Sequence, residues 1–123
     1  MRYRPLLGVL ALATLSMPLV SCINSPSLTS IVVSPSTMNF GGAGLHAQLT
    51  AIGYYTHPNH PPITRDITDE VTWESSASPD CVIVNNTGAI TTGGNVCSNI
   101  LVSASMPGFN GIITGTMTVN VTQ

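Results

Sequence analysis

The sequence contains no lysine, and its three basic side chains are Arg2, Arg4 and Arg65. A protein that binds nucleic acid needs a basic patch on its surface, and three arginines at these positions cannot form one. Four of the five acidic residues lie in the single stretch Asp66–Ser76. We therefore exclude nucleic acid as a partner.

The sequence also lacks an apolar run long enough to span a membrane. The stretch Leu6–Val20 is 15 residues long and is interrupted by Pro18, whereas a spanning helix needs about 20 residues. Because Arg2 and Arg4 precede it, the stretch is typical of a secretory signal peptide. A buried helix of the fold and an uncleaved N-terminal anchor are the alternatives.

The apolar run ends in Leu19-Val20-Ser21-Cys22, which resembles the lipobox of bacterial lipoproteins. The resemblance implies cleavage of residues 1–21, lipid transfer to the Cys22 thiol and acylation of the new amino terminus. Several acyl chains, at about 0.8 kcal/mol per buried methylene, hold a protein on a membrane without a spanning helix. Ile23, in place of an aspartate, resembles the outer-membrane pattern of cells with two membranes. We expect an exported protein, lipid-anchored in the cell envelope.

Two cysteines remain if Cys22 carries lipid, namely Cys81 and Cys97. In an exported protein such a pair predicts a disulfide. The bridge would close a loop of 16 residues and stabilise the fold by about 3 kcal/mol on the loop-entropy model. Two buried free thiols are the alternative.

Beyond the signal peptide, no stretch has helical periodicity. Leu45–Tyr55 alternates apolar and polar residues most clearly, which predicts one half-buried strand of an antiparallel sheet. Thr56–Arg65 contains three prolines and is expected to be a loop. Asn110-Gly111 predicts a hairpin turn. Further strands are expected at Leu28–Val33, Thr37–Phe40, Val71–Ser76, Cys81–Val84, Ala89–Thr92, Ser98–Ser105 and Ile113–Val121. Seven to eight antiparallel strands with regular turns predict an all-β sandwich.

Trp73 is the only tryptophan of the chain. It alternates with Val71 and Ser75, so we expect it to face inward from Val71–Ser76, a central strand. Sandwiches of the immunoglobulin type favour a core tryptophan between their sheets. We interpret Trp73 as the anchor of the core, the alternative being an aromatic platform for a sugar or a peptide.

The order and spacing of the segments resemble the bacterial immunoglobulin-like domain of group 2. The resemblance covers Ser27–Thr122 and implies an immunoglobulin-like β-sandwich over residues 28–123, behind a lipidated tether at residues 22–27. Such domains are found in adhesins of the intimin and invasin type and in extracellular enzymes as spacer or binding modules, and they share no catalytic residues. The segments that carry the resemblance to this family are Ser30–Ser36, Gln48–Tyr54, Asp66–Thr68, Val71–Trp73, Val82–Val84, Gly88–Thr91, Ile100–Ser105 and Gly115–Val121.

Neither catalysis nor metal binding has a recognisable pattern. The chain has no Gly-x-Ser-x-Gly turn and no histidine after a plausible nucleophile, so we expect neither an enzyme nor a cofactor. His57 and His60 supply two imidazoles where a metal site needs three or four ligands. A calcium ion takes six to eight oxygen ligands, and three carboxylates, those of Asp66, Asp69 and Glu70, would supply part of such a set. Capping of a turn is the simpler interpretation. We predict no metal site.

The expected function is non-catalytic binding or adhesion to a protein or glycan by a lipid-anchored envelope module. The candidate contact surfaces are Thr56–Arg65 and the turn Pro107–Gly111, which we expect at the same end of the sandwich. The ligand residues of the first would be His57, Asn59, His60 and Arg65. The alternatives are a structural subunit of an envelope assembly and, on His57 and His60, a metal-binding protein.

Overall fold

A computed structural model of the protein describes residues 25–77 and 81–123. Within these ranges the chain is all-β, as predicted, and no helix is long and apolar enough to cross a membrane. The strands are β1 (Ser27–Ser34), β2 (Thr37–Phe40), β3 (His46–Gln48), β4 (Thr50–His57), β5 (His60–Asp66), β6 (Thr72–Ser75), β7 (Val82–Val84), β8 (Ala89–Thr92), β9 (Cys97–Gly108) and β10 (Gly111–Val121).

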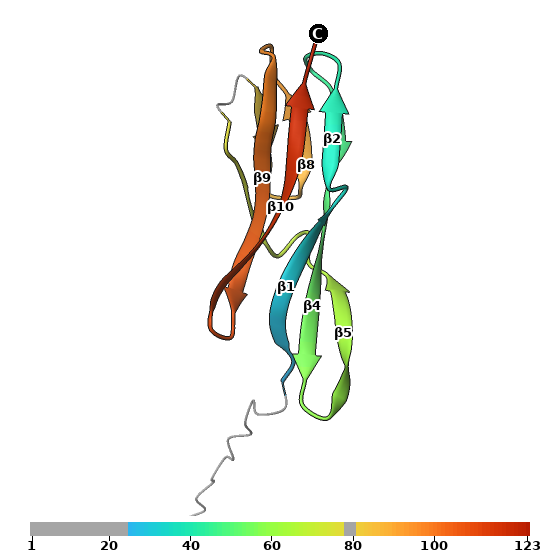
Figure 1. Cartoon of the computed structure of the whole chain (residues 1–123), viewed down its shortest axis with the longest axis vertical. Coiled ribbons are helices and arrows are strands. Elements are labelled where there is room, and N and C mark those ends of the chain that lie inside the picture. The colour runs from blue at the N-terminus through green and yellow to red at the C-terminus, as the bar shows by residue number, and fades with distance from the viewer. Residues whose placement is uncertain (1–24, 78–80) are drawn as a thin grey trace, which may run out of the picture.

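The described strands form three sheets, in the orders β1-β4-β5, β2-β10-β9-β6 and β3-β8-β7. All pairings are antiparallel except that of β2 with β10, which is parallel. The molecule is elongated (Figure 1). The start of β1 and the hairpins β4–β5 and β9–β10 lie toward one end of its long axis, and the end of β10 lies at the other.

The alternation predicted over Leu45–Tyr55 is present, but the single strand is not. Leu49 separates β3 from β4, and its backbone N–H donates to the carbonyl oxygen of Gly88, 2.9 Å away. On one side of Leu49 the chain pairs with β8, and on the other with β1 and β5. One amphipathic segment therefore contributes to two sheets.

The prediction that Thr56–Arg65 is a loop was wrong. β4 continues to His57, and His60–Asp66 forms β5, which pairs with β4. β5 is an edge strand, where a missing proline N–H costs no ladder bond. The pairing also shifts between Tyr55 and His57, which are paired with Ile63 and His60, so Pro61 and Pro62 fall at an irregularity in the ladder.

We expected the strand that contains Trp73 to be central, and this prediction was wrong. β6 lies at the edge of the four-stranded sheet, paired only with β9 there. Alternation predicts which side chains are buried, but it does not specify how many neighbours a strand has.

The strands Thr37–Phe40 and Ala89–Thr92 were predicted with the bounds that the structure gives them. The count of seven to eight was too low, since the described residues form ten strands.

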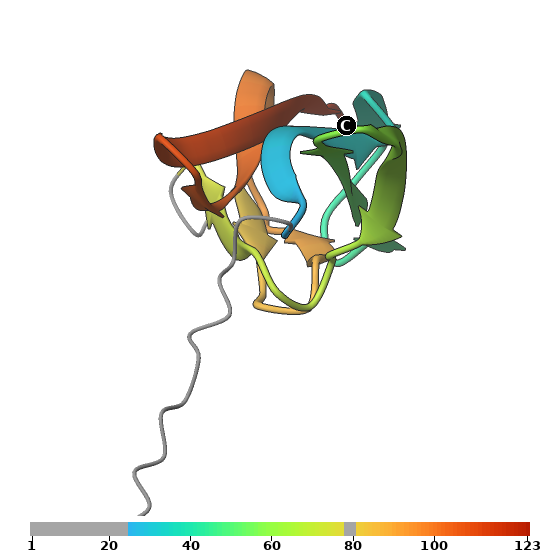
Figure 2. The ribbon, with the colours of Figure 1, turned by 90° about the horizontal axis from the view of Figure 1, so that it is seen from below.

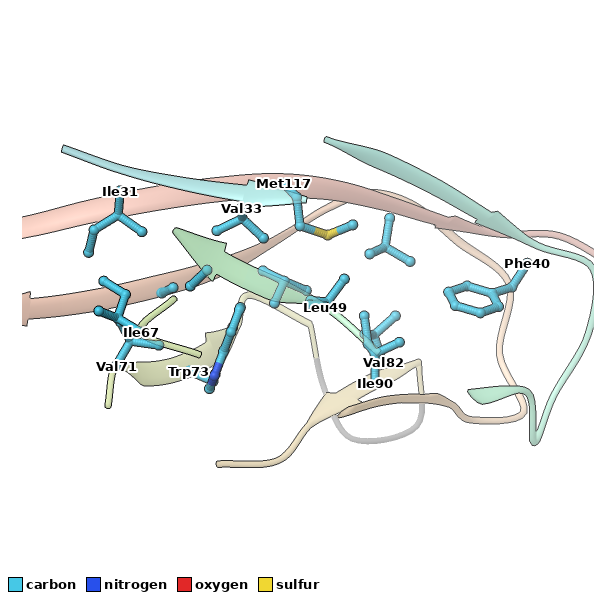
Figure 3. Packing of buried hydrophobic residues seen from close by; sticks show 14 of the residues in the cluster. Ile31, Val33, Phe40, Leu49, Ile67, Val71, Trp73, Val82, Ile90 and Met117 are labelled. Carbon is cyan, nitrogen blue, oxygen red and sulfur yellow. The ribbon is translucent and has the colours of Figure 1, made fainter. Parts of the chain in front are cut away.

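Side chains from all three sheets meet in one apolar core (Figure 3). The view along the long axis shows strands on all sides of this interior (Figure 2). Seven of its larger side chains are at most 2% exposed, so each contributes the full free energy of its apolar burial to folding. They are Leu49, Ile67, Val82, Ile90, Val102, Met117 and Val119.

The predicted disulfide is present between Cys81 and Cys97, whose Cα atoms are 6.3 Å apart. Cys81 directly precedes β7, and Cys97 is the first residue of β9. Because β7 and β9 belong to different sheets, the bridge joins a three-stranded sheet to the four-stranded one.

Candidate functional site

A shallow apolar groove lies where the start of β1 meets the hairpins β4–β5 and β9–β10. We call it the tether-end groove, because the described chain begins there at Ser25, within the tether predicted at residues 22–27. Its volume of about 770 Å³ falls in the range of about 300–1,000 Å³ typical of small-molecule sites. The residues that line it are Ser25, Pro26, Ser27, Leu28, Tyr55, Pro58, Met106, Pro107, Gly108 and Phe109.

The β9–β10 hairpin forms one wall of this groove. Gly108 pairs with Gly111 and leaves Phe109 and Asn110 as a two-residue turn. The predicted hairpin is therefore present, but its turn lies one residue earlier than Asn110-Gly111. Gly111 has φ = 135°, a conformation that L side chains rarely adopt. The turn leaves the Phe109 side chain 80% exposed and that of Ile112, two residues after the turn, 66% exposed.

The β4–β5 hairpin reaches the same groove through Pro58. Its turn is Pro58-Asn59, with Asn59 in the left-handed region at φ = 63°. The rings of His57 and His60 meet edge to face with their centroids 4.2 Å apart. The Nδ1–H of His60 donates to the carbonyl oxygen of Pro58 over 3.0 Å. These contacts give the two imidazoles a structural role in closing the turn.

Arg65 does not join the histidines. It lies five residues beyond His60, roughly 16 Å along an extended strand, and pairs with Gly53. Its guanidinium forms an exposed ion pair of 3.1 Å with Glu70, and its Cζ lies 5.6 Å from the centre of the Tyr55 ring. Of the four residues predicted for a ligand loop, the structure brings together His57, Asn59 and His60.

The acidic turn before β6 is closed by its own hydrogen bonds. Asp66 Oδ1 accepts from the Thr68 hydroxyl at 2.5 Å and from the Thr68 N–H at 3.0 Å. The hydroxyl and then the backbone bond hold the pKa of Asp66 below its ordinary value of 3.8. The carboxylate of Glu70 accepts a hydrogen bond from the guanidinium of Arg65. Residues 25–77 and 81–123 contain no group of three His, Cys, Asp or Glu side chains placed to hold a metal ion.

Trp73 lies in the core, with 7% of its surface exposed. Cys22, the predicted lipidation site, lies outside the described residues.

The opposite end of the molecule has a surface that the sequence analysis did not single out. We call it the outer end and define it by the loops Gly41–Leu45 and Gly93–Val96. Thr92 is buried and joins them, since its hydroxyl donates to the Gly42 carbonyl at 2.8 Å and accepts from the Leu45 N–H at 3.0 Å. The Gly44 N–H donates to the Thr92 carbonyl at 2.9 Å. Both loops contain glycine, which favours turns, but the sequence does not show that the two loops lie together.

The outer end exposes two apolar side chains and carries no charge. Leu45 is 42% exposed and Val96 is 57% exposed, and neither loop contains Asp, Glu, Lys or Arg. The hydrogen bonds of Thr92 hold the two loops together, and an uncharged surface held in this way needs little ordering on binding a partner.

No protein-family model matches the chain, and no curated protein matches it in sequence.

Proposed function

We propose that the chain is a non-catalytic, lipid-anchored module of the bacterial cell envelope, with an immunoglobulin-like fold, that binds a protein or glycan through its outer end. The observation that carries the proposal is the position of the tether. Ser25, three residues after Cys22, lies in the tether-end groove, and the outer end lies at the far end of the long axis (Figure 1).

The pairing of the strands supports the immunoglobulin-like assignment. β3 and β4 are successive strands separated by Leu49 alone. β4 pairs with β1, β3 pairs with β8, and β8 pairs with β7. The second layer has the order β2-β10-β9-β6. This pairing supports assigning the two layers to the ABED and CFG sheets of an immunoglobulin sandwich, with β2 added beside the last strand and β5 added beside β4.

The length of the tether supports the orientation. Three residues span at most about 11 Å when fully extended, so a lipid on Cys22 keeps Ser25 close to the bilayer surface. The tether end then faces the membrane, and the His57–His60 hairpin faces it too. The outer end faces away from it and is open to a partner.

Acylation is tested on the protein purified from a bacterial envelope. We expect the peptide that begins at Cys22 to carry the mass of its lipid. The Cys22→Ser variant should move to the soluble fraction. An unmodified Cys22 in a protein that is exported and folded would contradict the anchor.

Binding is tested by screening the protein against arrays of envelope proteins and glycans and measuring Kd for each hit. Replacing Leu45 and Val96 together by serine should weaken a specific hit about tenfold or more, since each 1.4 kcal/mol is tenfold in Kd. The matched control replaces Val32 and Leu101, which are 46% and 47% exposed on strands β1 and β9. If the control weakens binding and the outer-end variant does not, a sheet face is the binding surface, as expected of a structural subunit.

A further inference from the structure

The end of the molecule at which the described chain begins carries the most exposed of the large apolar side chains. Phe109 and Ile112, at 80% and 66%, are the two most exposed of the large apolar side chains that the structure describes. Both belong to the tip of the β9–β10 hairpin, where Ile112 is paired with the exposed Pro107. Large apolar side chains that are exposed together on a projecting turn are typical of a surface that contacts a protein or a membrane.

The segments that form this end carry no charge. Residues 25–30, 57–64 and 106–114 contain no Asp, Glu, Lys or Arg. The five charged side chains that the structure describes all lie within Arg65–Glu74, between the end of β5 and β6. Nothing at the tip would therefore have to lose the hydration of a full charge on entering a lipid surface.

We propose that the tether end docks directly on the lipid bilayer, with Phe109 and Ile112 inserted at the boundary between headgroups and acyl chains. This deepens the function proposed above and rests on the acylation of Cys22. Phe and aliphatic side chains form the membrane-facing side of interfacial elements, where they are buried about 5–10 Å into that boundary. The tether-end groove faces the same surface, since Phe109 and Ser25 both line it.

The anchor and the hairpin act together. An acyl anchor at Cys22 keeps Ser25 within about 11 Å of the place where the lipid enters the bilayer. Because Phe109 lines the same groove as Ser25, the tip stays near the bilayer and its insertion is an intramolecular step at high effective concentration. Insertion by two side chains, too weak to recruit a free protein, is then sufficient. The result is a domain held in one orientation, with Leu45 and Val96 facing away from the membrane.

The test places a tryptophan at each end of the lipid-anchored chain. The F109W variant and the matched V96W variant are reconstituted into phosphatidylcholine vesicles with bromine on the acyl chains, and the emission of Trp73 in the unsubstituted chain is subtracted. We expect the added emission of F109W to fall by about half at a depth of about 5–10 Å and that of V96W to stay unchanged. Equal emission from both variants with and without bromine would overturn the proposal, as would quenching of V96W alone.

Failure of the anchor is distinguished from failure of docking in the same samples. The mass of the Cys22 peptide reports acylation independently of fluorescence. If Cys22 carries no lipid, the anchor is supplied by coupling its thiol to a maleimide lipid, because Cys81 and Cys97 are bridged and Cys22 is the remaining cysteine. Quenching of F109W then supports docking without native acylation. Unquenched F109W on vesicles that retain the protein overturns docking and leaves the groove to a protein partner.

Discussion

The indole N–H of Trp73 donates a hydrogen bond of 2.9 Å to the carbonyl oxygen of Thr68. The hydroxyl of Thr68 in turn accepts from the backbone N–H of Ala51 at 3.0 Å and donates to Asp66. Trp73 belongs to β6 and Ala51 to β4, so one turn fastens the edge of the four-stranded sheet to a strand of another sheet. Trp73 is therefore both a core side chain and a link between layers.

Replacing Trp73 separates these two roles. We expect Trp73→Phe to lower the free energy of unfolding by about 1–2 kcal/mol, because the Thr68 carbonyl loses its indole donor. Trp73→Ala also removes the ring and should cost about 3–5 kcal/mol. Urea unfolding followed by circular dichroism measures both. The neighbouring exposed Glu74→Ala variant is the control, with an expected change below about 0.5 kcal/mol. Equal midpoints for Trp73→Phe and the native chain would show that the hydrogen bond contributes nothing.

Asp66 should make stability depend on pH. Its folded-state pKa is held below 3.8 by two hydrogen bonds from Thr68, so the unfolded chain takes up the proton first as the pH falls. The contribution is present above the unfolded pKa and is lost as the pH falls through the lower folded value. Urea midpoints measured from about pH 6 to about pH 2 should therefore fall less for Asp66→Asn than for the native chain. Parallel curves for the two proteins would contradict the prediction.

Side-chain alternation predicted the strands and much of the core, because it records which side chains leave water. The buried positions of β10, including Met117 and Val119, follow it directly. It does not record which strand lies beside which. The edge position of β6 and the change of sheet at Leu49 depend on pairings between distant residues, and no local pattern contains them.

The candidate site was predicted in its parts but not in its orientation. The proximity of Pro58 and Pro107 in one groove agrees with the expectation that the two turns lie at one end. That Ser25 lies there too depends on the direction of β1 in the sheet, which the sequence does not give. Pro61 and Pro62 favour a loop because a proline is excluded from a central strand, but the edge position of β5 admits them.

Gly115 is required where β1 crosses β10. A Cβ on this residue would overlap the carbonyl oxygen of Ile31, which is backbone and cannot turn away. We expect Gly115→Ala to lower the free energy of unfolding by about 1–3 kcal/mol, the usual penalty of an overpacked core. Gly94→Ala is the matched control, because a Cβ there would meet no atom within 4 Å, and it should change stability by less than about 0.5 kcal/mol. Similar urea midpoints for the two variants would mean that β1 moves away from β10 freely.

The disulfide should account for a large part of the stability of the domain. It closes a separation of 16 residues, for which the loop-entropy model gives about 3 kcal/mol. Replacing Cys81 and Cys97 together by alanine should lower the urea midpoint accordingly, and reduction of the native chain should lower it by a similar amount. Cys22→Ser is the control, because it removes the third cysteine and leaves the bridge intact. The native chain should also be lighter than its reduced form by two hydrogen atoms. An unchanged mass after reduction would show two free thiols, and the double variant should then lose only the packing of the buried Cys81 side chain.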